Sequence, residues 1–552
     1  MHRHQPQSIA LDGWELMGFA GALDDVEQFS FVAQQRMRCR VGVKCDGVHT
    51  LTSRKPRVLI FIVAYNAERT IQQVLRRVPI ELSGYDTEIL VIDDSSSDAT
   101  VEQARALERE SHLPFPLTVL FNPVNLGYGG NQKVGFLYAI RNEFDFVALV
   151  HGDGQYAPER LPDLLEPLIK GEADAVFGSR MIGKWDALRG GMPAYKFIGN
   201  RILTGIQNRL LGSSLSEFHS GYRLYSVKAL ASVPFQLNAN EFHFDTDIII
   251  QFMRAGLRIK ELPIPTYYGD EVCYVNGFRY AWDVCAASLV AYTQDLGIFY
   301  ERKFDVRQSH ARYESKLAFD SSHTLVVDRV PPDTRVLDLG CASGVVSSAL
   351  LTKNCRITAM DVTPLPGQPR FERFIRHNLN DLPLPIDTAD FDYILLLDVI
   401  EHLQSPETFV AELRRLRTEG RATRVIVTTG NIGFLVTRLM LLLGAFNYGA
   451  RGILDLTHSR LFTFTTLRRL FEQAGYRIDE IRGIPAPFPL AVGNKILGRL
   501  LLKLNRLLIH LSKGLFSYQI LMVVAPLPSS EWLLSQAIQT HGSVNVPVQQ
   551  GD

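Results

Sequence analysis

The chain has 552 residues, of which 46% are hydrophobic and 21% are charged. This composition excludes the disordered and fibrous classes, and the length exceeds what one ordinary hydrophobic core holds. The 58 Lys and Arg residues balance the 58 Asp and Glu residues, so nucleic acid is not an expected partner. The six cysteines form no CxxC pair and no metal-ligand spacing, which indicates buried thiols in a reducing compartment.

Targeting and membrane-spanning signals are weak. The start, "MHRHQPQSIALDGWELMGFAGALDD", lacks a basic segment followed by an apolar one, so no secretory signal is predicted. The stretch "VIVTTGNIGFLVTRLMLLLGAFNYGA" is divided by Arg438, whereas a spanning helix needs about 20 apolar residues. We interpret it as a strand, a loop and a short buried or interfacial helix, and we expect a cytoplasmic protein.

Two regions alternate short β-rich runs with helical segments. In the first, 56–300, the runs "RVLIFIVAYN", "TEILVIDDSS", "LTVLFN", "DFVALVHGD" and "ADAVFGSR" are strand-like. In the second, 331–527, the runs are "RVLDLGCAS", "RITAMDVT", "DYILLLDVI", "RVIVTTGN" and "SYQILMVVAP". Each alternation predicts a largely parallel sheet covered by helices on both faces.

The fold class is therefore α/β with two different Rossmann-like domains. Residues 1–55 are interpreted as an N-terminal extension that is disordered in part, 301–330 as a charged helical linker, and 528–552 as a disordered tail.

Polar residues gather where the strands of the first region end. Asn66, Asp93, Asp94 and Asp153 each follow such a run, and ligands bind α/β sheets beyond the carboxyl ends of the strands. Gly-Asp-Gly at 152–154 is also a common turn, so Asp153 is either a turn former or a metal ligand.

The order of motifs in the first region resembles the family 2 glycosyltransferases of the nucleotide-diphospho-sugar (GT-A type) fold, especially the branch that acts on dolichyl and polyprenyl phosphate. The resemblance covers about residues 57–280 and rests on "VAYNAERTIQQVL", "VIDDSSSDAT", "NLGYGGNQKVGF", "HGDGQYAPERL", "GSRM" and "SGYRLYS". It implies a nucleotide-sugar donor, a UDP- or GDP-sugar, and a polyprenyl-phosphate or glycan acceptor.

The resemblance also implies roles for individual residues. Asp93 and Asp94 would contact the base and ribose, with helix capping as the alternative. Asp153, helped by Gln155, would hold Mg²⁺ or Mn²⁺ against the diphosphate leaving group. The family's first acidic position in this motif is His151 here, and imidazole is a poor magnesium ligand.

Further residues complete the implied donor site. The candidates for nucleotide-sugar binding are Asn66, Asp93, Asp94, Asn125, Gly127, Arg180, Ser220 and Arg223. Arginine suits phosphate because its planar fork binds two oxygens, and a surface ion pair is the alternative for either arginine. Asp245, preferred over Asp247, is the candidate base in "EFHFDTDIII", although an ionised phosphate acceptor needs none; helix capping is the alternative for both.

The second region opens with "RVLDLGCASG", which resembles the first motif of class I S-adenosylmethionine-dependent methyltransferases. Asp338, Gly340 and Gly344 are in place, and Ala342 replaces the usual central glycine. A methyl group is tolerable there as long as φ stays negative. A dinucleotide-binding turn, and hence an NAD-linked oxidoreductase, is the alternative.

Later segments favour the methyltransferase. "FDYILLLDVIEHL" and "DLTHSRLFTFTTLRRLFEQAGYRI" also resemble that family. The resemblance implies S-adenosylmethionine as cofactor, with Asp361 on the ribose hydroxyls and Asp381 near the adenine. His402 and His458 are candidate bases beside the methyl acceptor, or structural histidines paired with Glu401 or Asp455.

Near the C-terminus, "NKILGRLLLKLNRLLIHLSKG" places Lys495, Arg499, Lys503 and Arg506 among leucines at helical spacing. Such a basic amphipathic helix fits peripheral attachment to an anionic membrane. A domain-packing helix with a solvated basic edge is the alternative.

The sequence thus predicts a bifunctional enzyme: a metal-dependent glycosyltransferase joined to a methyltransferase that modifies a glycan, a glycolipid or a related small molecule. Two other functions remain open at this point. One is a nucleotide-binding scaffold with degraded sites, which His151 and Ala342 favour. The other is sugar transfer to a non-lipid acceptor in polysaccharide or secondary-metabolite synthesis.

Overall fold

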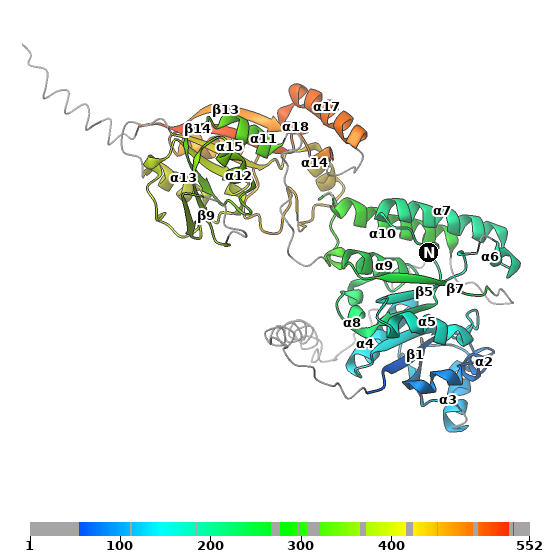
Figure 1. Cartoon of the computed structure of the whole chain (residues 1–552). Helices are drawn as coiled ribbons and strands as arrows, with labels where there is room; N and C mark the ends of the chain where they lie inside the picture. The colour runs from blue at the N-terminus through cyan, green and yellow to red at the C-terminus, as the bar shows by residue number, and fades with distance from the viewer. Residues whose placement is uncertain are drawn as a thin grey trace, which may run out of the picture. The chain divides into compact units, whose positions relative to one another are not determined.

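The computed structural model of the chain is shown in Figure 1. It describes residues 54–528 except 111–112, 184, 267–275, 296, 307–320, 365–370, 416–422, 450 and 490–494, and in addition residue 534. The predicted extension at 1–55 and the predicted tail at 528–552 therefore lie almost wholly outside the described residues.

The first region folds around a seven-stranded sheet with the order β3-β2-β1-β4-β6-β5-β7. Its strands are β1 (Arg57–Ala64), β2 (Asp86–Asp93), β3 (Leu117–Phe121), β4 (Phe146–His151), β5 (Ala175–Ser179), β6 (Arg223–Ser226) and β7 (Ile259–Pro263). The α-helices are α2 (Ile71–Arg76), α3 (Thr100–Glu110), α4 (Tyr128–Arg141), α5 (Leu161–Ile169), α6 (Asp186–Arg189), α7 (Ala194–Leu211), α8 (Val227–Leu230), α9 (Phe244–Arg254) and α10 (Gly277–Asp295). Single 3₁₀ turns are η1 (Ile80–Gly84), η2 (Pro158–Arg160), η3 (Phe235–Leu237) and η4 (Arg302–Phe304).

The central strand β1 is apolar on both faces because both faces are covered. Ile60 and Ile62 belong to one buried cluster, and Leu59 and Phe61 belong to another. Successive strand residues point to opposite faces, so the continuous run "VLIFIV" supplies two cores at once. This confirms the sheet that the alternation predicts.

The direction of β6 was not predicted. β6 runs antiparallel to both β4 and β5, with Arg223 opposite Leu149. Since β6 begins where β4 is ending, its first residue lies near the same sheet edge as the carboxyl ends of β1, β2 and β4. The chain changes side between β1 and β4, and a crevice at such a switch point is the usual ligand site.

The second region also has a seven-stranded sheet, with the order β10-β9-β8-β11-β12-β14-β13. Its strands are β8 (Arg335–Leu339), β9 (Arg356–Asp361), β10 (Arg373–Arg376), β11 (Tyr393–Leu397), β12 (Arg424–Gly430), β13 (Tyr476–Ile484) and β14 (Gln519–Pro526). Its helices are α11 (Ser322–Arg329), α12 (Val345–Leu351), α13 (Pro406–Arg415), α14 (Leu435–Leu442), α15 (Phe464–Gln473), α17 (Lys495–Leu511) and α18 (Lys513–Phe516), with 3₁₀ turns η5 (Thr388–Asp390) and η6 (Ile400–His402).

The predicted final strand is β14, which runs antiparallel to its neighbours β12 and β13. The switch point of this sheet lies between β8 and β11. The α/β class with two Rossmann-like domains is therefore confirmed.

Helix α11 lies inside the stretch predicted to be a linker. Its Val326, with Val330 just beyond it, packs in the buried cluster that also contains Val336 of β8 and Leu350 of α12. We therefore propose that the second domain begins before α11.

The apolar stretch around Arg438 forms the strand β12, a loop and the short helix α14, as predicted. Among the described residues, no helix combines the length and the apolar character needed to cross a bilayer.

Packing of α4 on the sheet generates a stability prediction. A Cβ on Gly135 of α4 would lie 2.1 Å from the Phe61 ring, so Gly135→Ala should destabilise the first domain by about 1–3 kcal/mol through overpacking. Gly199 of α7 has nothing within 4 Å of its Cβ position, and Gly199→Ala should be neutral or stabilising by about 0.5–1 kcal/mol. The urea dependence of hydrogen exchange in β1 peptides measures the unfolding free energy of both variants. Equal changes in the two variants would contradict the close packing of Gly135 on Phe61.

Candidate active sites

The loops after β1 and β2 are fastened to each other by polar side chains. Asn66 has a φ of 49°, a left-handed conformation that asparagine tolerates better than most residues. Its backbone N–H donates to Ser96 Oγ at 2.8 Å, and its Oδ1 accepts from the Ser97 N–H at 3.0 Å. The predicted binding residue Asn66 thus shapes the rim of the first crevice.

The two predicted nucleotide carboxylates differ in their surroundings. Asp93 is fully buried and accepts from the N–H and hydroxyl of Ser96 at 2.8 and 2.5 Å. Burial raises the pKa of Asp93, although the bonds from Ser96 oppose that shift. Asp94 Oδ1 accepts from Asn122 Nδ2 at 2.8 Å and from the Leu126 N–H at 2.9 Å. Asp93 therefore holds its own turn, and Asp94 ties the glycine loop to the edge of the sheet.

The glycine loop packs closely against another part of the chain. Asn125 donates from Nδ2 to the Asp94 carbonyl at 3.0 Å and accepts from the Gly127 N–H at 3.0 Å. Gly127 has a φ of 79°, and a Cβ there would lie 2.8 Å from the Asn240 carbonyl oxygen. The Gly129 N–H donates to that same oxygen at 2.6 Å. Asn125 and Gly127 thus shape the loop.

Asp153 is half-buried directly beyond β4, and its Oδ1 accepts from the Gln155 N–H at 3.0 Å. It is therefore a turn former through one oxygen. Among the described residues, no group of three or more His, Cys, Asp and Glu side chains is placed to hold a metal. One carboxylate beside a diphosphate still fits Mg²⁺ or Mn²⁺, because such ions keep water and phosphate oxygens as ligands.

His151 belongs to a chain of hydrogen bonds that the sequence did not reveal. Tyr128 Oη donates to Asp245 Oδ2 at 3.0 Å and lies 3.2 Å from His151 Nε2. Since the single tyrosine proton goes to the carboxylate, His151 Nε2 carries a proton and donates to Tyr128. Burial lowers the pKa of His151, which favours the neutral ring. His151 thus supports Asp245 through Tyr128.

The buried guanidinium of Arg223 connects several segments at this edge of the sheet. Arg223 is buried, and it donates to the carbonyl oxygens of Ser220, Asp245 and Phe218 at 2.7, 3.0 and 2.7 Å. Its Nη2 lies 3.6 Å from Asp245 Oδ2. The structure therefore brings the predicted residues Ser220, Arg223 and Asp245 together, and Arg223 holds the other two through its hydrogen bonds.

Arg180 is paired with an acid that the sequence analysis overlooked. Its Nε donates to Glu217 Oε1 at 3.1 Å, and its Nη2 also bonds that oxygen. Glu217 is buried; burial alone would raise its pKa, but the Arg180 charge and hydrogen bonds bring the pKa below the usual value. The partners are 37 residues apart, so no local pattern could have joined them.

Asp247 faces away from this group. Its Oδ2 accepts from the Ala239 N–H at 3.0 Å and from Lys303 Nζ at 3.1 Å. Burial raises the pKa of Asp247, and Lys303 opposes the shift. The preference for Asp245 over Asp247 thus fits the geometry, because only Asp245 contacts Tyr128 and Arg223.

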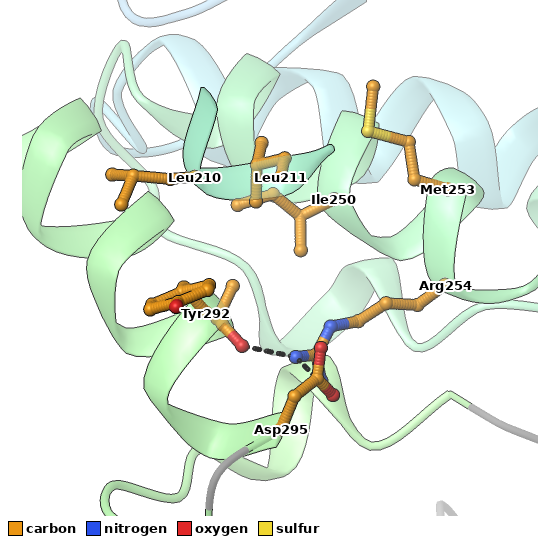
Figure 2. Close-up of a pocket in the computed structure, with 8 residues that line it drawn as sticks. Leu210, Leu211, Ile250, Met253, Arg254, Tyr292 and Asp295 are labelled. Carbon is orange, nitrogen blue, oxygen red and sulfur yellow. Dashed lines mark hydrogen bonds and ion pairs between the residues drawn. The ribbon is translucent and has the colours of Figure 1, made fainter. Parts of the chain in front are cut away.

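A cavity of about 140 Å³ lies elsewhere in this domain, between α7, α9 and α10 (Figure 2). Leu210, Leu211 and Ile250 line its apolar side, and Arg254 and Asp295, which form an ion pair of 3.1 Å, also line it. It contains none of the predicted site residues.

In the second domain, the glycine turn after β8 is clamped by Asp361. Asp361 Oδ2 accepts from the Ala342 N–H at 2.8 Å, and its Oδ1 accepts from the Thr363 N–H at 2.9 Å. Ala342 has a φ of 46°, so the condition under which a methyl group is easily tolerated at this position is not met. The left-handed conformation costs alanine more than glycine, and the Asp361 bond opposes that cost.

Gly340 and Gly344 also have positive φ, 75° and 68°. A Cβ on Gly340 would lie 2.5 Å from Val399. Asp338 is buried and accepts from Ser347 Oγ at 2.5 Å, and burial raises its pKa to about 6. These residues build a tight turn at the carboxyl end of β8.

Asp381 is exposed in the loop after β10, and the neighbouring Asn380 Oδ1 accepts from the Gln404 N–H at 2.8 Å. That bond places the loop beside the segment that carries His402. His402 and His458 lie edge to face, with ring centroids 4.7 Å apart. The structure therefore pairs His402 with His458 and places the loop that carries Asp381 next to the segment that follows His402.

The hydrogen-bond partners of the two histidines are not the carboxylates considered above. Each ring contacts a backbone carbonyl, and His402 Nδ1 also lies 3.1 Å from the Thr457 hydroxyl, which itself donates to Asp455. Nδ1 of His402 lies 3.2 Å from the Thr457 carbonyl, and Nδ1 of His458 lies 2.9 Å from the Ile453 carbonyl. A carbonyl only accepts, so Nδ1 carries the proton in each ring, and Nε2 of a neutral ring keeps a lone pair. Burial lowers the pKa of His458, which suits a proton acceptor.

Comparison with known proteins bears on both domains. Residues 59–233 match the family described as "Glycosyl transferase family 2". The undecaprenyl-phosphate mannosyltransferase of Micrococcus luteus is 31% identical over 216 residues, which cover 38% of this chain and 82% of that protein. The chain belongs to glycosyltransferase family 2.

A second family 2 relative is the UDP-N-acetylglucosamine–dolichyl-phosphate N-acetylglucosaminyltransferase of Methanococcus voltae. It is 29% identical over 222 residues, which cover 39% of this chain and 86% of that protein. A solved structure, glucosyl-3-phosphoglycerate synthase from Mycobacterium tuberculosis with Mn²⁺, UDP and glucosyl-3-phosphoglycerate, is 20% identical with a TM-score of 0.33, covering 43% of this chain and 79% of that one.

Residues 310–481 match the family described as "Methyltransferase domain". The chain therefore carries a family 2 glycosyltransferase domain and a methyltransferase domain, which confirms the two resemblances. A methyltransferase domain implies S-adenosylmethionine as the methyl donor.

The buried carboxyl group of Glu401, next to His402 in the chain, predicts that the stability of this domain depends on pH. It is buried, and burial, with the nearby Asp398 charge, raises its pKa well above the ordinary 4.5. Its stabilising contribution is therefore complete below pH 4.5 and is lost as the pH rises toward the raised pKa. Glu401→Gln keeps an oxygen for the Gly430 N–H and removes the charge. We expect its melting temperature to exceed the wild type by about 2–4 °C at pH 8 and to match it at pH 4.

Differential scanning calorimetry at the two pH values measures this difference. Glu407→Gln, an exposed carboxylate on α13, is the matched control and should change neither value. A Glu401→Gln variant that is less stable than the wild type at pH 8 would contradict the raised pKa.

Proposed function

We propose that the family 2 domain transfers a sugar from a nucleoside diphosphate to a polyprenyl phosphate, with a divalent cation at Asp153. The observation that carries this proposal is the gathering of Asp94, Asp153, Ser220, Arg223 and Asp245 beyond one sheet edge, at the switch point between β1 and β4. The relatives named as undecaprenyl-phosphate and dolichyl-phosphate sugar transferases support the acceptor class.

In this proposal the rim of the crevice binds the nucleoside. Asp94 uses Oδ1 to hold the glycine loop, and its Oδ2 accepts from the base or ribose. Asn66 and Asn125 fix the loops on either side. Asp93, with both oxygens bonded to Ser96, positions Asp94 without touching the ligand.

Asp153, with the Gln155 amide, binds the cation that neutralises charge on the departing diphosphate. Its Oδ1 bond to Gln155 holds the carboxylate in place beyond β4. His151 is not needed as a ligand in this scheme, and its Nε2 is engaged by Tyr128.

The acceptor phosphate is already ionised, so it attacks the anomeric carbon without losing a proton. Asp245, paired with Arg223 and Tyr128, then has the role of orienting the sugar hydroxyls rather than of a base. Arg180, directly after β5, positions the segment around Glu217, since its guanidinium is engaged by Glu217.

For the second domain, we propose methyl transfer from S-adenosylmethionine to a glycan or lipid-linked glycan. Asp361 binds the ribose hydroxyls while its contact with Ala342 holds the turn open. Asp381 lies on the adenine side. The Nε2 lone pair of His402 or His458 receives the acceptor proton, and methyl transfer itself then depends on alignment of the two reactants.

The donor-site proposal is tested with purified protein, UDP- or GDP-sugars, Mn²⁺ and polyprenyl phosphate. Asp153→Ala should lower lipid-linked sugar formation by about 100-fold or more and leave S-adenosylhomocysteine binding intact. Asp163→Ala, an exposed carboxylate on α5, is the control and should keep full transfer. Transfer by Asp153→Ala at the wild-type rate would refute the cation site, and a wild type that forms no nucleotide product would favour a scaffold.

The methyl-donor site has its own test by calorimetry with S-adenosylhomocysteine. Asp361→Ala removes the ribose acceptor and the clamp on Ala342, so the Kd should rise about 10- to 100-fold. Asp390→Ala, exposed in η5, should bind as the wild type does. Unchanged binding by Asp361→Ala, or quenching of NADH fluorescence by the wild type, would contradict the site.

A further inference from the structure

Helix α17 is attached to the methyltransferase domain by a narrow inward face. Leu502 is buried, and the buried Asn505 accepts from the Ala486 N–H at 3.0 Å and donates to the Phe516 carbonyl at 2.9 Å. A Cβ on Gly498 would lie 2.9 Å from Pro489. These positions recur at helical spacing, so one face of α17 is fixed against its own domain.

The opposite face is apolar and exposed to solvent. The exposed fractions are 79% for Ile496, 62% for Leu500, 51% for Leu504, 63% for Leu507 and 76% for Leu511. Residues three or four apart share one face of a helix, so these side chains form a continuous stripe, here called the leucine stripe. A solvated basic edge on a packing helix predicts the reverse, with the leucines buried.

Basic side chains flank the leucine stripe on one side. Arg499 and Lys503 are exposed and Arg506 is half-buried. At 100° per residue they lie between the inward face and the stripe. The sequence contains no Asp or Glu between Glu480 and Glu531, so no acidic side chain of this segment offsets their charge.

A second exposed apolar group belongs to the end of α14. Leu441, Leu442 and Leu443 are 61%, 81% and 75% exposed. The segment before α14 is bound to α18, which follows α17: Asn431 Nδ2 donates to the Gly514 carbonyl at 3.1 Å. The two apolar surfaces thus lie on connected elements of the methyltransferase domain (Figure 1).

We propose that the leucine stripe and its basic flank dock on an anionic lipid bilayer. The leucines enter the interface between headgroups and acyl chains, and the basic residues contact lipid phosphates. A second copy of this chain fits less well, because two such helices face to face would bring like-charged basic flanks together. The inference concerns attachment and does not depend on which acceptor the family 2 domain uses.

The test is flotation of the full chain with vesicles of phosphatidylcholine containing 30 mol% phosphatidylglycerol and no polyprenyl phosphate. The wild type should float with these vesicles. In the variant that combines Arg499→Gln with Lys503→Gln, the bound fraction should fall about 5-fold for each charge lost. Leu500→Glu with Leu507→Glu should reduce flotation at least about tenfold. The matched control, Ile80→Glu with Phe121→Glu, changes two exposed apolar residues of the other domain and should float normally.

Three results would overturn the proposal. The first is a wild type that stays with the soluble fraction, and the second is flotation of the leucine variant equal to that of the control. The third is a lower oligomeric state of the leucine variant in sedimentation without vesicles, which would assign the stripe to a second copy. S-adenosylhomocysteine binding checks the fold of the variants, and transfer to a short, water-soluble isoprenyl phosphate separates failure of docking from failure of the proposed sugar transfer.

Discussion

The buried guanidinium of Arg223 is the interaction on which the first active-site edge depends. It reaches three carbonyl oxygens and the carboxylate of Asp245, so it joins the start of β6, the segment before it and the first turn of α9. A buried charge is tolerated only with such partners. Because Asp245 also accepts a hydrogen bond from Tyr128, the same ion pair fixes the position of the aromatic side chains beside β4.

Both domains use one carboxylate to hold a glycine-containing loop through backbone N–H groups. Asp94 does so for the loop after β3, and Asp361 does so for the turn after β8. A carboxylate at the end of a parallel strand can accept from a neighbouring loop and still offer its other lone pairs to a ligand. The predicted ligand-binding acids are therefore also the residues that build the loops.

Much of the fold could be predicted because the strands are short apolar runs with polar residues at their carboxyl ends. The region around β1, β2, β4, β8 and β11 follows from that pattern alone. The antiparallel direction of β6 could not be predicted, because its four residues carry no signal of direction. The pairing of Arg180 with Glu217 and the contact of Tyr128 with Asp245 depend on distant segments, which a single sequence does not reveal.

Gly221 lies directly beneath His151: a Cβ there would be 2.5 Å from the imidazole ring. The ring is also in edge-to-face contact with Tyr128 and Tyr156. Replacing His151 with a shorter acid would leave a hollow above Gly221 and remove the hydrogen bond that His151 Nε2 donates to Tyr128. Gly221 and the two tyrosines therefore limit the size and shape of the side chain that fits at position 151.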